Sequence, residues 1–152
     1  MAGVKVAITV QDDGFRDALT RLLAVTANLK PAFDEIGSAL LATTEQRFEA
    51  EAGPDGVPWA AHSAATLLRR GSSARKLRDK GHLYASLTYA SSRLQAEVGT
   101  NRIYARIHQL GGKAGRGRKV TIPARPYLGV SADDRTMIGE ILTDHLALAV
   151  RK

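Results

Sequence analysis

The sequence has no cysteine, only 5% aromatic residues and no long apolar run. Without cysteine the chain can form neither a disulfide nor a thiolate metal site. The histidines are His62, His82, His108 and His145. They lack the paired spacing of metal ligands, so we expect neither zinc nor another cofactor. A membrane span needs about 20 consecutive apolar residues, and the N-terminus lacks a signal-peptide pattern, so we expect a cytoplasmic protein without membrane contacts.

The chain does contain enough apolar material for a core of its own. Its 152 residues are 44% hydrophobic, which suits one domain that buries a core. No internal repeat is evident. We therefore expect a single domain spanning residues 1–152.

The positive charge is concentrated in two segments. The formal net charge is +7, and residues 69–80 and 113–125 contribute +5 each, so the rest of the chain sums to −3. Residues 113–119 combine four cations with glycine and alanine, a composition that cannot bury apolar surface. We expect two mobile basic loops, about residues 69–80 and 113–121, whose charge needs an acidic partner or solvent.

Apolar periodicity predicts long amphipathic helices. The first begins at Asp12 or Asp13, ends near residues 28–31, and has an apolar face formed by Phe15, Leu19, Leu22 and Leu23. The second covers residues 33–48, with Arg47 off an apolar stripe formed by Phe33, Ile36, Gly37, Leu40, Leu41, Thr44 and Phe48. The last begins at Asp133 or Asp134, and its face comprises Met137, Ile138, Ile141, Leu142, His145 and Ala149, widened by Leu146 and Leu148.

Alternating apolar residues predict strands. One is expected at residues 4–10, and residues 83–89 and 94–98 flank a polar turn as an antiparallel hairpin does. Helices and strands do not alternate regularly along the chain. This order predicts an α+β fold, with a mostly antiparallel sheet, two to three long amphipathic helices packed on one side of it, and extended loops.

The connection at residues 53–59 contains two glycines, two prolines and Asp55 before the only tryptophan. We expect Trp59 to hold this loop to the body, and the Asp55 carboxylate to accept hydrogen bonds from nearby backbone amides. Ser63 is a candidate cap for a short helix at residues 64–68.

Residues 99–131 contain the most specific order of features. Three residues, Tyr104, Ile107 and His108, fall on one face of a short helix. Thr100 or Asn101 can cap this helix, and Gly111 and Gly112 end it. Farther on, two prolines flank Arg125 and favour an extended strand at residues 122–130.

Four segments carry a resemblance to a known family. They are FEAEAGPDGVPW (48–59), DKGHLYASL (79–87), VGTNRIYARIHQLGG (98–112) and IPARPYLGVS (122–131). In this order they closely resemble the phage virion morphogenesis family, the tail-completion and head–tail joining proteins of Mu-like and related tailed bacteriophages. The similarity runs from about Phe33 to the C-terminus and includes no catalytic signature. It implies a structural, non-enzymatic virion protein that is assembled in the cytoplasm of the bacterial host.

The resemblance further implies a ring at the head–tail neck or at the head-proximal end of the tail. A hexamer is the first expectation, with the tail tube and the head–tail connector as partners. A ring needs a heterologous interface, and basic loops beside a mildly acidic body are complementary surfaces for one. Candidate interface residues are Arg75, Lys76, Lys113, Arg116, Arg118, Lys119, Arg125 and Tyr127. Motif residues expected to support folding and assembly are Trp59, Tyr104, His108, Gly111, Gly112, Pro123 and Pro126.

The alternative function is sequence-nonspecific nucleic-acid binding through the two basic loops. The charge fits, but neither basic segment contains an aromatic residue for base stacking, and no helix-turn-helix or zinc pattern occurs. A transient, salt-sensitive contact with genomic DNA remains compatible with the sequence. Arg125 suits a phosphate or a carboxylate of a neighbouring subunit, and we favour the carboxylate.

The sequence supports a catalytic function less than either of these two functions. His108 has no nucleophile in a recognisable motif, and Asp55 and Asp79 do not form a spaced carboxylate pair. The run GGKAGRGRK lacks the order of a phosphate-binding P-loop. We therefore predict no enzymatic activity.

Overall fold

The structure is a computed structural model that describes residues 13–151. The strand predicted at residues 4–10 lies outside the described residues. The elements, in chain order, are α1 (Asp13–Ala27), α2 (Lys30–Ala50), α3 (Ala64–Arg70), the 3-10 turn η1 (Tyr84–Ser86), β1 (Leu87–Ser91), β2 (Ala96–Thr100), α4 (Ala105–Leu110), β3 (Gly112–Ala114), the 3-10 turn η2 (Arg116–Arg118), β4 (Val120–Ile122) and α5 (Ala132–Arg151).

The predicted long helices form, with boundaries set by local chemistry. α1 ends at Ala27, and Pro31 occupies the first turn of α2, where its missing N–H costs nothing. α2 ends at Ala50 because Glu51 adopts a left-handed conformation (φ 53°) and donates its backbone N–H to the carbonyl of Arg47.

The start of α5 is closed by a reciprocal cap. The Ser131 hydroxyl accepts the backbone N–H of Asp134 (3.0 Å), and the Asp134 carboxylate accepts the N–H of Ser131 (2.8 Å). Both otherwise unpaired donors of the first turn are thereby satisfied.

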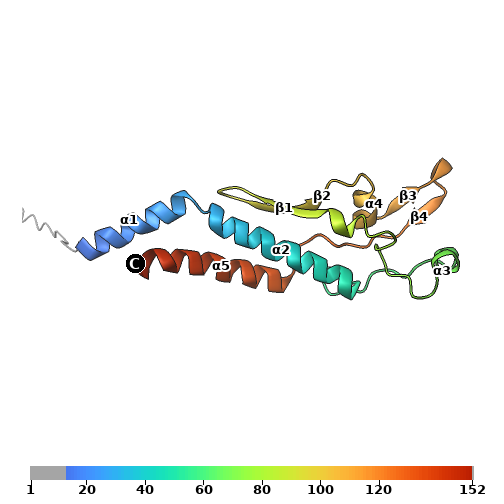
Figure 1. Cartoon of the computed structure of the whole chain (residues 1–152), viewed down its shortest axis with the longest axis horizontal. Coiled ribbons are helices and arrows are strands. Elements are labelled where there is room, and N and C mark those ends of the chain that lie inside the picture. Colours follow the sequence, from blue (N-terminus) through green and yellow to red (C-terminus); the bar gives the residue numbers. More distant parts are fainter. Residues whose placement is uncertain (1–12, 152) are drawn as a thin grey trace, which may run out of the picture.

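The helices and strands are arranged along one long axis (Figure 1). α5 runs back beside α2 and α1, and the β1–β2 hairpin packs against α2. Gly37 allows this approach, since a Cβ atom there would lie 2.5 Å from Cδ2 of Tyr89. The predicted α+β class is confirmed, with antiparallel strands beside packed helices.

The strands differ from the prediction in two places. The β1–β2 hairpin forms, but its first strand begins only at Leu87, because residues 84–86 turn as η1. The chain around residues 113–121 is not an irregular loop: β3 and β4 pair as a second, separate antiparallel hairpin. Whether this hairpin is mobile in the free chain stays a prediction.

Two local predictions for residues 99–131 are wrong. The N-cap of α4 is Tyr104, without a side-chain hydrogen bond, while the Thr100 hydroxyl accepts the N–H of Arg102 and closes the preceding turn (3.2 Å). The strand expected at residues 122–130 ends at Ile122, because the residues beyond it bond to loops and side chains and not to a neighbouring strand.

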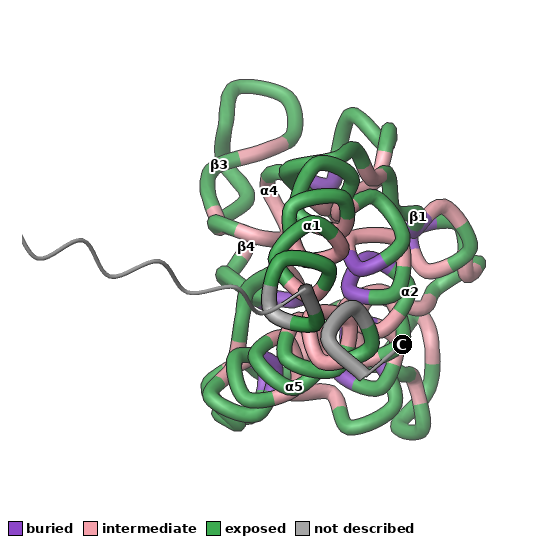
Figure 2. The backbone as a smooth tube through the Cα atoms, turned by 90° about the vertical axis from the view of Figure 1, so that its left-hand side faces the viewer, coloured by how far each residue is buried: buried purple, intermediate pink, exposed green. Residues whose placement is uncertain are grey.

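The core is small and lies off-centre. Among the described residues only eight hydrophobic side chains are buried, and most of them pack around Phe48 near the C-terminal end of α2. Figure 2 shows few buried positions along the tube as a whole. No described residue of α1 is buried, and no helix of residues 13–151 is long and apolar enough to cross a membrane.

Candidate assembly surface

An aromatic junction holds the middle of the molecule together. The ring of Phe48 packs against Trp59 and Tyr127, with centroids 5.3 Å apart in both pairs, and against Tyr84 at 5.6 Å. The Trp59 indole N–H also donates to the carbonyl of Pro126 (2.7 Å). The prediction that Trp59 holds its loop to the body is confirmed, because the side chain is 4% exposed and ties residues 53–59 to the segment before α5.

The segment that contains Arg125 is held by α4 on one side and by the loop before α3 on the other. The backbone N–H of Arg125 donates to the carbonyl of His108 (2.8 Å), and its guanidinium donates to the carbonyls of Ala60 and Ala61 (both 2.9 Å). The side-chain amide of Gln109 makes three hydrogen bonds to the backbone of Tyr127 and Leu128. Arg125 and Tyr127 therefore lie inside the chain, 7% and 1% exposed, and their contacts are intramolecular.

A buried ion pair joins α2 to the first turn of α5. The Arg47 guanidinium binds the Asp134 carboxylate and donates to the carbonyls of Tyr127 (3.1 Å) and Gly129 (2.9 Å). Burial raises the pKa of Asp134, but hydrogen bonds from Ser131 and the charge of Arg47 outweigh it and leave the pKa below its ordinary value. This carboxylate therefore stabilises the fold at neutral pH, and its contribution is lost as the pH falls through its lowered pKa.

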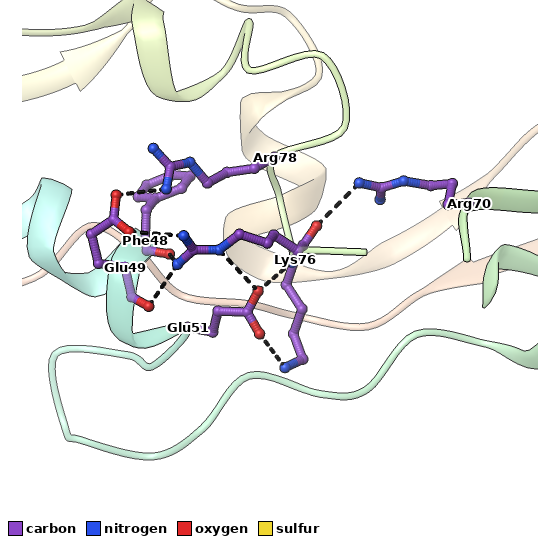
Figure 3. A network of polar contacts seen from close by, with 7 residues as sticks. Phe48, Glu49, Glu51, Arg70, Lys76 and Arg78 are labelled. Atoms are coloured by element: carbon purple, nitrogen blue, oxygen red, sulfur yellow. Dashed lines mark hydrogen bonds and ion pairs between the residues drawn. The ribbon is translucent and has the colours of Figure 1, made fainter. Parts of the chain in front are cut away.

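The first basic segment is bound to the end of α2 (Figure 3). Arg75 and Arg78 bind the Glu49 carboxylate (2.9 and 2.6 Å), and Lys76 binds Glu51 through its backbone N–H and its ammonium group (both 2.6 Å). Arg75 also donates to the carbonyls of Phe48 and Glu49, the last acceptors of the helix. These cations complement the helix C-terminus and are neutralised within the chain.

The second basic segment has no such partners. Lys113, Arg116, Arg118 and Lys119 lie on the β3–β4 hairpin, are largely exposed apart from their backbone pairing, and make no side-chain hydrogen bond or ion pair with the described residues. Four cations thus remain unneutralised at one end of the molecule, where Figure 1 places the hairpin beside α3 and α4.

A cleft of about 370 Å³ lies between α3, α4 and the end of β4. Its lining includes three imidazoles, four cations and one carboxylate, from His62, Arg69, Arg70, Asp79, Lys80, His82, His108 and Arg125. The His62 Nε2 and His108 Nδ1 atoms are buried without a hydrogen-bond partner. An unsatisfied buried polar atom costs roughly 1–3 kcal/mol. Burial, together with the charge of Arg125, lowers the pKa of His108, so this imidazole is neutral at pH 7.

Large apolar side chains are exposed at both ends of the long axis. At the helical end, which we define as α1 with the last turns of α5, they are Leu19, Leu23 and Leu148. At the hairpin end, defined as α3, α4 and the β3–β4 hairpin, they are Leu67, Leu68, Leu110 and Val120, with Ile103 and Tyr104 just before α4. The predicted apolar faces of α1 and α5 are therefore only partly covered within the chain at Leu19, Leu23 and Leu148.

Other predicted residues fall into structural positions. Tyr104 and His108 share a helix face, with their rings 6.0 Å apart. Gly111 ends α4 with φ 73°, and a Cβ there would lie 2.8 Å from the backbone nitrogen of Ala124. The Asp55 carboxylate accepts the N–H of Val57 (3.1 Å), which confirms the turn role predicted for it.

Sequence reasoning missed two residues that organise this region, Arg47 and Gln109. The sequence places Arg47 off the apolar stripe of its helix, whereas the structure buries it. The spacing of Ser131 and Asp134 signals a capping box, but nothing local marks Arg47 as the partner of that carboxylate. Gln109 also carries no sequence signal.

Among residues 13–151, no cluster of three or more histidine, aspartate or glutamate side chains could hold a metal ion.

Comparison with known proteins assigns this architecture to a family. The model of the phage virion morphogenesis family matches residues 10–147. The chain is 39% identical over 134 residues to the Mu-like prophage FluMu G protein 2 of Haemophilus influenzae, which covers 88% of this chain and 90% of the relative. It is 31% identical over 147 residues to the tail completion protein S of Escherichia phage P2, covering 87% and 95%. No solved structure matches the chain significantly.

Proposed function

The chain belongs to the phage virion morphogenesis family and has a role in phage virion assembly, and from this premise we propose that it is a non-enzymatic ring subunit. The ring lies at the head–tail neck or at the head-proximal end of the tail, where it contacts the tail tube and the head–tail connector. A hexamer is the simplest closed form we propose. The protein is then a component of the virion that is assembled in the host cytoplasm.

The observation that supports a ring is the difference between the two ends. The helical end exposes apolar side chains on α1 and α5, while the hairpin end exposes apolar side chains together with four unneutralised cations. A heterologous contact brings one patch of a subunit against a different patch of the next. Two unlike ends on an elongated subunit meet this requirement.

The exposed interface candidates carry this proposal. Arg116, Arg118 and Lys119 sit at the tip of the second hairpin with their charges free for a neighbour. Arg75 and Lys76 are already paired with Glu49 and Glu51, and Arg125 and Tyr127 are buried. We therefore assign the intersubunit contact to the hairpin tip, and a supporting role to the buried residues.

The experiment replaces the hairpin cations and follows particle assembly. In the triple variant Arg116→Ser, Arg118→Ser, Lys119→Ser, the fold should persist because these side chains make no hydrogen bond or ion pair with the described residues. Head–tail joining should fail, and complementation of a phage that lacks this gene product should yield few infectious particles. Electron microscopy of the lysate should show unjoined heads and tails.

A matched variant separates local contacts from total charge. Arg93→Ser, Arg102→Ser, Arg135→Ser removes the same charge from exposed positions outside the hairpin, and it should leave particle yield unchanged. Normal yield from the hairpin variant would contradict the proposed contact.

The unpaired cations of the β3–β4 hairpin make nucleic-acid binding a second candidate function. Phosphate contacts weaken steeply with salt. DNA binding by the purified protein that persists at about 150 mM salt and disappears in the hairpin variant would favour this candidate over subunit docking.

A further inference from the structure

The cleft between α3, α4 and β4 is lined by both polar and apolar side chains. Two of its imidazole nitrogens, His62 Nε2 and His108 Nδ1, are buried and unpartnered. Arg69 and Lys80 at its edge make no hydrogen bond or ion pair with the described residues. The two histidines and the two unpaired cations thus line one cleft.

The lining determines which ligand chemistry fits. With neutral histidines the lining side chains carry four positive charges and one negative charge, and that negative charge, Asp79, is paired with Arg70 (3.0 Å). An imidazole N–H and a guanidinium both donate to a carboxylate. The cleft also has an apolar wall, formed by Leu77, Leu83 and Ile122. An aliphatic residue beside the carboxylate of a bound ligand can cover this wall.

We propose that this cleft binds an acidic side chain, flanked by an apolar residue, from a short segment of a neighbouring virion protein. Only the source of that segment rests on the proposed function. The mixed apolar and imidazole lining favours a peptide over nucleic acid, since a phosphate backbone needs a row of cations along a groove. The volume of about 370 Å³ suits a few side chains.

The test uses the purified full chain and the peptide acetyl-Leu-Asp-Leu-amide. Imidazole NMR signals of His62 and His108 should shift saturably on titration, because both rings line the cleft that the carboxylate enters. The signal of His145, which bonds to Glu35 on α2 (3.0 Å), should stay unchanged. Acetyl-Leu-Asn-Leu-amide, which has the same shape without the charge, should bind about tenfold more weakly.

Matched variants establish that the cleft is responsible. Arg69→Ser with Lys80→Ser should weaken peptide binding about tenfold without changing the melting temperature, because both side chains are exposed and unpaired. Arg93→Ser with Arg102→Ser removes equal charge elsewhere and should leave the affinity unchanged.

Three results would overturn the inference. The first is the absence of a saturable shift at His62 and His108. The second is an equal loss of affinity in both double variants, which would indicate bulk charge attraction. The third is tighter binding of hexathymidylate than of the peptide at these histidines, which would assign the cleft to nucleic acid. Because the titration needs no assembled ring, a chain that fails to assemble can still bind the peptide, and the two proposals fail separately.

Discussion

The aromatic junction and the helical end show two different uses of apolar residues. Around Phe48 the rings of Trp59 and Tyr127 are buried, and each donates a hydrogen bond to a backbone carbonyl, Trp59 to that of Pro126 and Tyr127 to that of Ala105. Along α1 the apolar positions Leu19 and Leu23 are 43% and 70% exposed. Both regions carry amphipathic patterns, yet only the junction completes its burial within the chain.

This difference shows which region stabilises the free subunit and which region leaves apolar surface for another chain to cover. A side chain contributes hydrophobic free energy only to the extent that it leaves water. The junction therefore stabilises the free subunit, while the helical end keeps apolar area that a neighbouring chain can cover. Variants that weaken one region can therefore be compared with control variants in the other.

The largest effect is expected from Trp59→Ala. Removing this buried indole should lower the free energy of unfolding by about 3–5 kcal/mol. Leu23→Ala, at the largely exposed position on α1, should change it by less than about 0.5 kcal/mol. Chemical denaturation of the two variants measures both values. Similar losses would show that the helical end is as fully packed as the junction.

Ion pairs at the two regions should differ in the same way. Asp134→Asn leaves the Arg47 charge buried without its partner and should cost about 3 kcal/mol. Glu35→Gln removes the partner of His145 at an exposed site and should cost less than about 0.5 kcal/mol. Equilibrium unfolding at pH 7 checks both. A small cost for Asp134→Asn would mean that solvent reaches Arg47.

Alanine substitutions at two glycines distinguish backbone strain from steric crowding. Gly111 and Gly71 both have positive φ, 73° and 87°, but only at Gly111 would a Cβ meet neighbouring backbone. Gly71→Ala should cost about 2 kcal/mol from strain alone, because φ 87° with ψ 163° is a conformation that essentially only glycine adopts. Gly111→Ala should cost more, because α4 must also move from Ala124. Melting temperatures of the pair give the difference. Equal losses would show that the segment after β4 shifts freely.

The smallest effect is a pH dependence at the edge of the junction. Since burial lowers the pKa of His108 below its ordinary value of 6.5, protonation favours the unfolded chain. Stability is then complete above pH 6.5 and decreases as the pH falls through the lowered folded-state pKa. The decrease should be smaller in His108→Gln, measured by denaturation between about pH 7 and 5. Parallel pH profiles would contradict the assignment.

Much of the secondary structure could be predicted because it depends on neighbours in sequence. The stripe of α2, the Ser63 cap and the β1–β2 hairpin arise from residues three, four or two positions apart, and the structure confirms them. The predictions that failed are those where a local pattern competes with distant contacts. Residues 84–86 alternate like a strand, but Leu83 turns into the core cluster and η1 forms there.

The interface candidates show the same limit. Arg75 and Lys76 look like free cations in sequence, yet they bind carboxylates about 25 residues away at the end of α2. Arg125 suits an external carboxylate, but Ala60 and Ala61 occupy its donors. Sequence shows which residues are charged, whereas the folded chain shows which charges are already paired.

The sequence by itself determined the long helices, the α+β class and the family, because periodicity, caps and motif order are properties of short stretches of chain. Only the tertiary structure decided which side chains are buried and which charges are paired within the chain. It buried Arg47 against Asp134, paired Arg75, Lys76 and Arg78 with carboxylates at the end of α2, and left the hairpin tip unpaired. The physical reason is that burial and charge pairing depend on distances in space, and residues that meet in this fold lie up to 110 positions apart in the chain.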